Sequence, residues 1–304
     1  MRLTINDVDP CFNNAIAKCV HETNAESKAD TLTILIQDAD KKMSSLMFRQ
    51  NDVIRIDNGT ITTGDMFIHK CNPSGNYYEI KAMSIPVSGT VKKSMSWQHV
   101  RLLQILKQKA DEMGLTLSCY DVDNVAYEFV PQENETDMHF VLKLCERESL
   151  QAIVFDRRLI VYNEYEIESK EPGGSIILYD TDEYTYSDES YNMFKSCVIA
   201  GGGYSASFSD VDAKTSNVLS KIETYVESDS QSLRFAKGYL RAANKNAKHG
   251  TFVMPIDKRF SAGSVCYLNK SGVNDKKIML TKVRYDYKNE KMKVFFRDIF
   301  LEGY

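Results

Sequence analysis

Short apolar or alternating runs of residues, each bounded by turn residues, occupy both ends of this sequence. Such runs are typical of β-strands, because neighbouring side chains point to opposite faces of a sheet and Gly, Asn and Asp favour the turns between strands. The runs are residues 32–38, 52–57, 65–70, 76–84, 175–180, 194–202, 219–227, 251–256, 263–268, 277–287 and 291–300. Their spacing predicts a small barrel or sandwich at the N-terminal end, and a second β-rich region at the C-terminal end whose last two strands form a hairpin.

Helical periodicity is found twice between and within these β regions. Ser96 can cap a first helix that Gly114 ends, with apolar or weakly polar residues recurring three and four positions apart. A second helix, over about 230–248, is predicted to be capped by Asp229 or Ser230 and to stop at Gly250. The strands expected at 115–120 and 126–130, together with the first helix, make the middle of the chain an α+β region.

Composition excludes several classes of protein. The chain has 304 residues, more than one core usually serves, and its net charge of −4 argues against a general nucleic-acid binder, although a local basic patch could exist. No apolar run reaches the 18 or so residues of a membrane span, and the N-terminus lacks the apolar segment of a secretory signal. The 7 cysteines stand singly, so they are expected to be reduced and mostly buried in a protein made in a cytosol.

An acidic cluster with a histidine is the strongest candidate for a chemical site. Glu133, Glu135, Asp137 and His139 crowd seven positions, and Glu135 and His139 have the i, i+4 spacing of a metal-binding pair. The surrounding residues do not form an HExxH pattern. Asn134 at the N-cap with Asp137 at the third helical position forms an approximate capping box, and carboxylates stabilise the start of a helix. We therefore expect a helix start here, with His139 on its polar side.

Other motifs are explained by structure alone. Gly201–Gly203 is expected to form a strand end or tight turn, since it lacks the spacing of a nucleotide-binding loop. Trp97 is expected to be a packing anchor at the start of the first helix. The sequence contains neither a GxSxG nor a GxxxxGK[ST] motif. These observations predict a non-enzymatic protein without a catalytic residue, a cofactor or a metal.

Residues 129–163 resemble the signature of the late control protein D family. These proteins are the baseplate hubs of contractile phage tails and tailocins, and they are similar to the hub half of type VI secretion spike proteins. In the family, an aromatic-Q-x-x-E-[ST]-D-x-x-F-[LV] run opens a helix, and a hairpin follows. The matching residues here are Phe129, Gln132, Glu135, Thr136, Asp137, Phe140 and Val141, followed by a hairpin of residues 152–155 and 158–163 around Asp156–Arg157.

Two further segments fit this resemblance, and one residue departs from it. Residues 96–117 are similar to the helix that the family places before its motif. Residues 228–268 are similar to the long helix that leads to its last strands. The departure is Leu150, where the family often has a glycine after the motif helix.

The resemblance implies an α+β, β-rich fold with two tail-tube-like β-barrel domains and an inserted α+β domain. The first barrel would span residues 1–95, the insertion 96–168 and the second barrel 169–304. It also implies a structural role, as a trimeric ring that joins the hexameric tail tube to the trimeric central spike. Because the sequence ends at Tyr304, the spike is expected to be a separate protein.

The implied partners are two further copies of the chain, the tail tube protein and the central spike protein, with tape measure and baseplate wedge proteins as additional candidates. DNA would pass transiently through an acidic lumen, and no membrane is involved. The protein would reside in the tail baseplate of a virion or tailocin particle that is assembled in the bacterial host cytoplasm. The alternative function is a tail-associated peptidoglycan hydrolase or cell-wall-binding protein, for which the Glu135 and His139 spacing and the abundance of acidic residues are the motivation.

Overall fold

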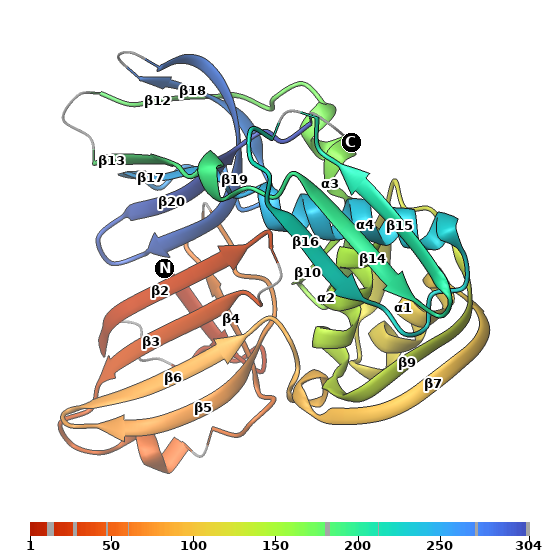
Figure 1. The fold of residues 1–304 in the computed structure, drawn as a ribbon. Helices are drawn as coiled ribbons and strands as arrows, with labels where there is room; N and C mark the ends of the chain where they lie inside the picture. The colour runs from red at the N-terminus through yellow and green to blue at the C-terminus, as the bar shows by residue number, and fades with distance from the viewer. Residues whose placement is uncertain are drawn as a thin grey trace.

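A computed structural model describes most of the chain (Figure 1). The described residues are 1–10, 15–26, 29–46, 48–59, 61–179, 183–211, 213–270 and 273–301, without the side chains of residues 44, 45 and 273–275. Strands dominate and helices are few, so the β-rich α+β class is confirmed. None of the described helices is long and apolar enough to cross a membrane.

The N-terminal β region forms half of a large sheet. Its elements are β1 (Arg2–Ile5), β2 (Ile16–Asn24), β3 (Thr31–Gln37), the 3₁₀ turn η2 (Met43–Leu46), β4 (Val53–Asp57), β5 (Met66–Ser74), β6 (Tyr77–Met83) and the 3₁₀ turn η3 (Val87–Thr90). All four strands predicted here are confirmed. Along β3, Leu32, Ile34 and Ile36 are buried while their neighbours are more exposed, as the alternating pattern requires.

The C-terminal β region continues the same sheet. Its strands are β12 (Ser175–Ile177), β13 (Tyr184–Asp188), β17 (Lys248–Pro255), β18 (Val265–Lys270), β19 (Val273–Asp286) and β20 (Lys291–Asp298). The predicted hairpin is confirmed as β19 and β20. β2 pairs with β19 in antiparallel fashion, which gives one 12-stranded sheet with the order β1-β4-β5-β6-β3-β2-β19-β20-β17-β13. Off this order, β18 pairs with β19, and β12 pairs with β18.

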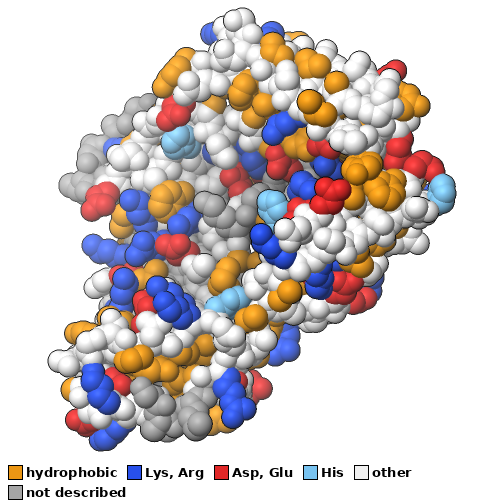
Figure 2. Space-filling view, turned by 60° about the horizontal axis from the view of Figure 1, so that its bottom comes forward, with side chains coloured by type: hydrophobic (Ala, Val, Ile, Leu, Met, Phe, Trp, Pro, Cys, Tyr) orange, Lys and Arg blue, Asp and Glu red, His pale blue; other side chains and the backbone are white. Residues whose placement is uncertain are grey.

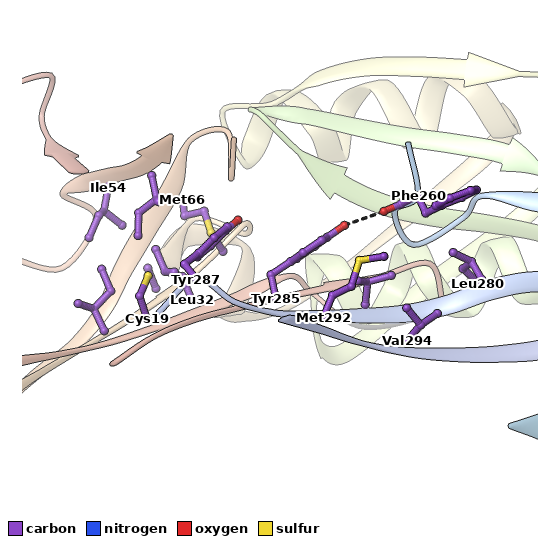
Figure 3. Packing of buried hydrophobic residues seen from close by; sticks show 14 of the residues in the cluster. Cys19, Leu32, Ile54, Met66, Phe260, Leu280, Tyr285, Tyr287, Met292 and Val294 are labelled. Atoms are coloured by element: carbon purple, nitrogen blue, oxygen red, sulfur yellow. Dashed lines mark hydrogen bonds between the residues drawn. The ribbon is translucent and has the colours of Figure 1, made fainter. Parts of the chain in front are cut away.

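One hydrophobic core crosses the β2–β19 junction (Figure 3). Cys19 and Leu32 come from the N-terminal half, while Tyr285 and Met292 come from the C-terminal half. The Tyr285 hydroxyl donates a hydrogen bond to the carbonyl oxygen of Phe260 at 3.0 Å. The finer prediction of two β-barrels is not confirmed, because the described strands form an open, continuous sheet. The spacing of strands along a sequence does not determine which strands pair.

The middle of the chain forms a separate α+β layer. Its elements are β7 (Lys92–Arg101), α1 (Leu102–Glu112), β8 (Thr116–Tyr120), β9 (Ala126–Thr136), α2 (Asp137–Arg147), β10 (Leu150–Phe155), β11 (Arg158–Asn163) and α3 (Glu164–Ser169). The hairpin predicted around Asp156–Arg157 is confirmed, and both turn residues have the positive φ values of a two-residue turn. Gly114, with φ +73°, ends α1 as predicted.

The first predicted helix starts too early. Residues 96–101 continue β7, which pairs with β9 over most of its length, and the helix begins at Leu102. Ser96 therefore caps no helix, and Trp97 lies on a strand. The backbone hydrogen bonds to β9 outweigh the weak helical periodicity of these residues, because local propensity is readily overridden by tertiary pairing.

A small sheet covers the long helix. It contains β14 (Ser196–Gly201), β15 (Tyr204–Ser209) and β16 (Val218–Ile222), lies near the 3₁₀ turn η4 (Ser190–Asn192), and packs on α4 (Asp229–Asn244). The cap of α4 is not the predicted Asp229 or Ser230 but Ser228, whose Oγ accepts a hydrogen bond from the Gln231 N–H at 3.1 Å. The helix ends before Gly250, which lies in β17 and is not the predicted stop signal.

The glycine triplet forms the tight turn between β14 and β15, as predicted. Gly202 and Gly203 have φ values of +58° and +87°, and a Cβ at Gly201 would lie 1.9 Å from the carbonyl oxygen of Glu223. A side chain therefore has no room at Gly201.

A second hydrophobic core joins the middle region to this small sheet. It combines α1, α2 and the β10–β11 hairpin with Cys197, Ile199, Phe235 and Leu240 from β14 and α4. The three-domain division at residues 95/96 and 168/169 stays a prediction. Six cysteines are free thiols in the structure, and Cys11 lies outside the described residues.

Candidate functional site

The acidic cluster lies where β9 passes into α2, and its cap differs from the prediction. The N-cap is Thr136, whose Oγ1 accepts a hydrogen bond from the His139 N–H at 3.2 Å. Asn134 lies inside β9 with φ +49°, and its N–H donates to Ser94 Oγ at 3.0 Å. The ladder with β7 extends β9 to Thr136, so Asp137 is the first helical residue instead of the third.

Asp137 is the centre of a buried polar group that joins four elements. Its carboxylate accepts hydrogen bonds from Lys93 Nζ at 2.6 Å, Lys109 Nζ at 2.9 Å and Gln132 Nε2 at 3.1 Å. These partners come from β7, α1 and β9, and Asp137 itself opens α2. The side chains of Asp137 and Lys109 are both fully buried. We call Lys93, Lys109, Gln132 and Asp137 the Asp137 group.

Electrostatics keep this carboxyl group ionised. Burial by itself raises the pKa of Asp137, but the hydrogen bonds from Lys93, Gln132 and Lys109 outweigh it, so its pKa is lower than usual. Gln132 also donates to the carbonyl oxygen of Glu135 at 3.0 Å, which fixes the last turn before the helix. The motif residues Gln132 and Asp137 thus hold a junction of the fold together.

The apolar motif residues support the same junction. Phe140 stacks on Trp97 with ring centroids 5.2 Å apart, and Lys109 Nζ lies 5.1 Å from the Trp97 ring centroid. Val141 is fully buried in the second core. The Phe129 ring contacts Tyr225 at 5.0 Å, and its N–H donates to Glu227 Oε1 at 2.9 Å. Trp97 therefore acts as a packing anchor, but from a strand.

Glu135 and His139 do come close, in an arrangement that serves the surface of α2. His139 Nε2 lies 3.6 Å from Glu135 Oε2, and the His139 side chain is 68% exposed. The other carboxylate oxygen accepts a hydrogen bond from Lys143 Nζ at 2.6 Å. Among the described residues, no group of three or more His, Cys, Asp and Glu side chains could hold a metal ion. The pair lacks a third ligand there.

A second buried polar centre was not predicted from the sequence. It joins the large sheet to two helices through three acids and three bases, so it is formally neutral. We call it the ion cluster, and its members are Glu26, Glu164, Glu168, Arg241, Lys245 and Arg297. In the sequence, these residues show only an i, i+4 spacing, between Glu164 and Glu168 in α3 and between Arg241 and Lys245 around the end of α4. Charged residues with this spacing are equally common on solvated helices.

Arg297, on β20, is fully buried and bridges the two acids of α3. Its Nη2 lies 2.5 Å from Glu168 Oε1 and 3.0 Å from Glu164 Oε1. Arg241 Nη2 lies 2.6 Å from Glu168 Oε1, while Lys245 Nζ lies 3.1 Å from Glu164 Oε1. Every acid therefore meets more than one cation, which compensates for the loss of water around the buried charges.

Because of the ion cluster, the free energy of unfolding is expected to depend on pH in the acid range. Burial raises the pKa of Glu164, but Lys245, Arg297 and Arg241 outweigh it and lower the pKa from the ordinary 4.5 to about 2. A lowered pKa means that the stabilisation is complete above about pH 4.5 and is lost as the pH falls toward 2. Urea unfolding at a series of pH values should show a loss of roughly 3 kcal/mol over this window.

The control for this prediction is Glu164→Gln, which cannot titrate. Its free energy of unfolding should be lower at neutral pH and should fall less steeply below about pH 4.5 than that of the wild type. Parallel pH curves for the two proteins would contradict the role of Glu164.

A cavity of about 1090 Å³ lies between η4, the 210–217 loop, the end of α4 and residues 298–301. Its buried polar side chains are already occupied: Asn244 Nδ2 donates to the Phe194 carbonyl oxygen at 2.8 Å, Asp210 Oδ1 accepts from the Ala213 N–H at 3.3 Å, and Lys245 pairs with Glu164. The buried polar residues that line this cavity therefore stabilise the fold through their existing contacts.

The fold of this chain was compared with solved structures, and its sequence with known families and proteins. No protein-family model matches the sequence, and no curated protein sequence matches it. The solved tail protein from Neisseria meningitidis MC58 superposes with a TM-score of 0.75 at 10% identity, covering 98% of this chain and 95% of that one. The 43 kDa tail protein of prophage MuSo2 from Shewanella oneidensis gives 0.70 at 11% identity, covering 98% and 97%.

The chain has the fold of phage tail proteins. The same tail-protein fold is found in the E. coli c3393 protein, a component of the type VI secretion system with structural similarity to the T4 bacteriophage tail proteins gp27 and gp5. That superposition has a TM-score of 0.61 at 11% identity and covers all of this chain and 79% of the other. The resemblance drawn from residues 129–163 is thus confirmed at the level of the fold.

Proposed function

We propose that this protein is the structural baseplate hub of a contractile phage tail or tailocin. Three chains would form a ring that joins the hexameric tail tube to the trimeric central spike, without catalysing a reaction. The observation that carries the proposal is the likeness over nearly the full chain to tail proteins and to a type VI secretion component. A solved PdpA–VgrG complex adds support, with a TM-score of 0.56 at 10% identity.

The proposal includes a division of labour along the chain. Residues 1–95 and 169–304 would be the two tube-like domains, and residues 96–168 the inserted domain. The partners would be the tail tube and spike proteins, with tape measure and wedge proteins nearby, and DNA would pass through the ring. The protein would be assembled in the bacterial cytoplasm and reside in the tail baseplate of the particle.

Exposed apolar side chains on one part of the chain support an assembled state. Nine of the large apolar residues that remain exposed lie within one stretch of the sequence, on β12, β13, β15, β16 and the loops beside them: Ile177, Tyr179, Tyr186, Tyr191, Tyr204, Val211, Val218, Ile222 and Tyr225. β13 is also an end strand of the large sheet, with backbone groups open to pairing. Such surfaces are typical of regions that are covered by another protein.

Mass measurement of the purified chain tests the ring. We expect a species of three 34.7 kDa chains, and microscopy of particles should place it between tube and spike. Ile177→Glu combined with Ile222→Glu should shift the mass toward the single chain, because both side chains would be covered in the ring. Val8→Glu, at a similarly exposed apolar residue of the N-terminal region, is the control. A strict monomer that never enters a tail particle would refute the proposal.

The alternative, a tail-associated peptidoglycan hydrolase or cell-wall-binding protein, is tested separately. The hub proposal expects no release of peptidoglycan fragments by the purified wild type. Release that disappears in Glu135→Gln, with folding intact, would favour the alternative instead.

A further inference from the structure

Basic side chains gather on the outer face of the large sheet, where β2 meets β19. Figure 2 shows Lys and Arg side chains concentrated at the left of the visible face, between its two lobes. Near this junction, seven bases and three acids lie among the described outward side chains of six adjacent strands. Lys277 and the buried Arg297 point the same way but lie farther along β19 and β20, and they are not counted here. We call this surface the basic face, and its charged residues are Lys18, Lys70, Lys81, Lys282, Arg284, Lys291, Lys293, Glu22, Glu79 and Asp286.

Strand register places these charges on one side of the sheet. Lys70 on β5 is opposite Lys81 on β6, and Arg284 on β19 is opposite Lys293 on β20. Residues next to them along the strands, such as Ile80 and Val294, point into the core. Neighbouring strands lie about 5 Å apart, so the six strands spread the bases over a surface about 25 Å wide.

Most of these bases lack a carboxylate partner. Glu22 is shared by Lys282 at 2.8 Å and Arg284 at 3.5 Å. Lys81 pairs with Glu79 at 3.3 Å. Lys18, Lys70, Lys291 and Lys293 make no ion pair with a described carboxylate, and all four are exposed. The formal excess on the face is four positive charges, on a chain whose net charge is −4.

The chemistry of the basic face favours a polyanion over a protein partner. Protein interfaces have an apolar core, and here the only large apolar side chain described as exposed on the six strands is Tyr77, at 37%. Nine of the exposed large apolar residues lie instead between residues 177 and 225, outside these six strands. Unpaired lysines spread over a broad sheet fit a ligand with evenly distributed charge, such as a phosphate backbone.

We infer that the basic face binds the phosphate backbone of duplex DNA without reading its sequence. Its biological setting rests on the proposed hub, through which DNA would pass. On this inference, a local positive surface rather than an acidic one meets the duplex and holds it weakly and reversibly. Lysine suits this role, because its ammonium group is a point charge on a flexible side chain. The planar guanidinium of arginine, in contrast, binds phosphate in fixed directions.

Fluorescence anisotropy with a short labelled duplex tests the inference on the full-length protein. If about four phosphates are contacted, affinity should fall about 100-fold between 50 and 200 mM salt. Lys291→Glu combined with Lys293→Glu should weaken binding at least about 10-fold at low salt and flatten the salt dependence by about two units of slope. Lys92→Glu combined with Lys107→Glu makes the same charge change outside the large sheet and should have a smaller effect.

Three outcomes would overturn the inference. The first is absence of duplex binding by the wild type at low salt, and the second is an equal loss in both double variants. The third is tighter binding of poly-glutamate than of DNA, with the same dependence on Lys291 and Lys293, which would assign the face to an acidic protein. Mass measured on the same samples separates the two proposals. A trimer that does not bind DNA refutes only this inference, and a monomer that does bind refutes only the ring.

Discussion

Arg297→Met is expected to lower the free energy of unfolding by about 3–5 kcal/mol. The guanidinium is fully buried and contacts Glu164, Glu168 and Glu26. Met replaces much of its volume but none of its charge, which leaves the ion cluster with one uncompensated negative charge away from water. Urea unfolding at neutral pH, followed by circular dichroism, measures the loss.

Two further variants make this prediction specific. Arg284→Met removes an exposed arginine from the neighbouring strand β19, where its contact with Glu22 is 3.5 Å long, and should cost less than about 1 kcal/mol. Arg297→Met combined with Glu168→Met removes a charge of each sign and should recover part of the lost stability. If Arg297→Met and Arg284→Met were equally harmless, the ion cluster would not hold α3 and α4 to the sheet.

Asp137→Ala should cost a similar amount, about 3–5 kcal/mol. The variant leaves Lys109 fully buried with one carboxylate partner, Glu112, at 3.1 Å. It also removes one of the two acceptors of Lys93 and of Gln132, which keep Glu112 and the Glu135 carbonyl oxygen, and a buried N–H left without an acceptor adds to the loss. The measurement is again urea unfolding, with the fluorescence of Trp97 as a probe close to the site.

The control is His139→Ala in the same helical turn. Its side chain is exposed, so its removal should change stability by no more than about 0.5 kcal/mol. Lys109→Met combined with Asp137→Leu should be milder than Asp137→Ala, since both buried charges disappear together. Equal effects of Asp137→Ala and His139→Ala would show that the motif aspartate has no structural role.

These two centres explain how a mostly open sheet carries a helical layer. The Asp137 group joins β7, α1, β9 and α2 inside that layer. The ion cluster joins β20 of the sheet to α3 and to the end of α4. Each centre is directional, because hydrogen-bonded charges tolerate few arrangements. We therefore expect them to define the relative orientation of the parts as well as to stabilise them.

Much of the secondary structure could be predicted because it depends on neighbouring residues. Period-two patterns identified β3 and β6, and the tight turn of the β10–β11 hairpin follows from its two-residue connection. The presence of the motif helix was also predicted. Its cap was misplaced by two residues, since Thr136 and Asn134 are both good caps and only the length of the β7–β9 ladder decides between them.

The candidate site was predictable in its residues but not in its chemistry. The resemblance identified Gln132 and Asp137, yet it could not show that Lys93 and Lys109 bind them. Those lysines lie 44 and 28 residues away from Asp137 in the sequence. The ion cluster was missed for the same reason, because its acids and bases look like ordinary surface charges until the fold buries them.

The sequence by itself determined the type of most elements and the likeness to phage tail proteins. Both depend on short patterns, which backbone geometry and side-chain alternation impose locally. The tertiary structure alone decided that β2 pairs with β19, that six charges meet in one cluster and that lysines share one face. Residues as distant as His21 and Tyr285 meet in that pairing. Such contacts depend on the free energy of the whole fold, which a local pattern does not contain.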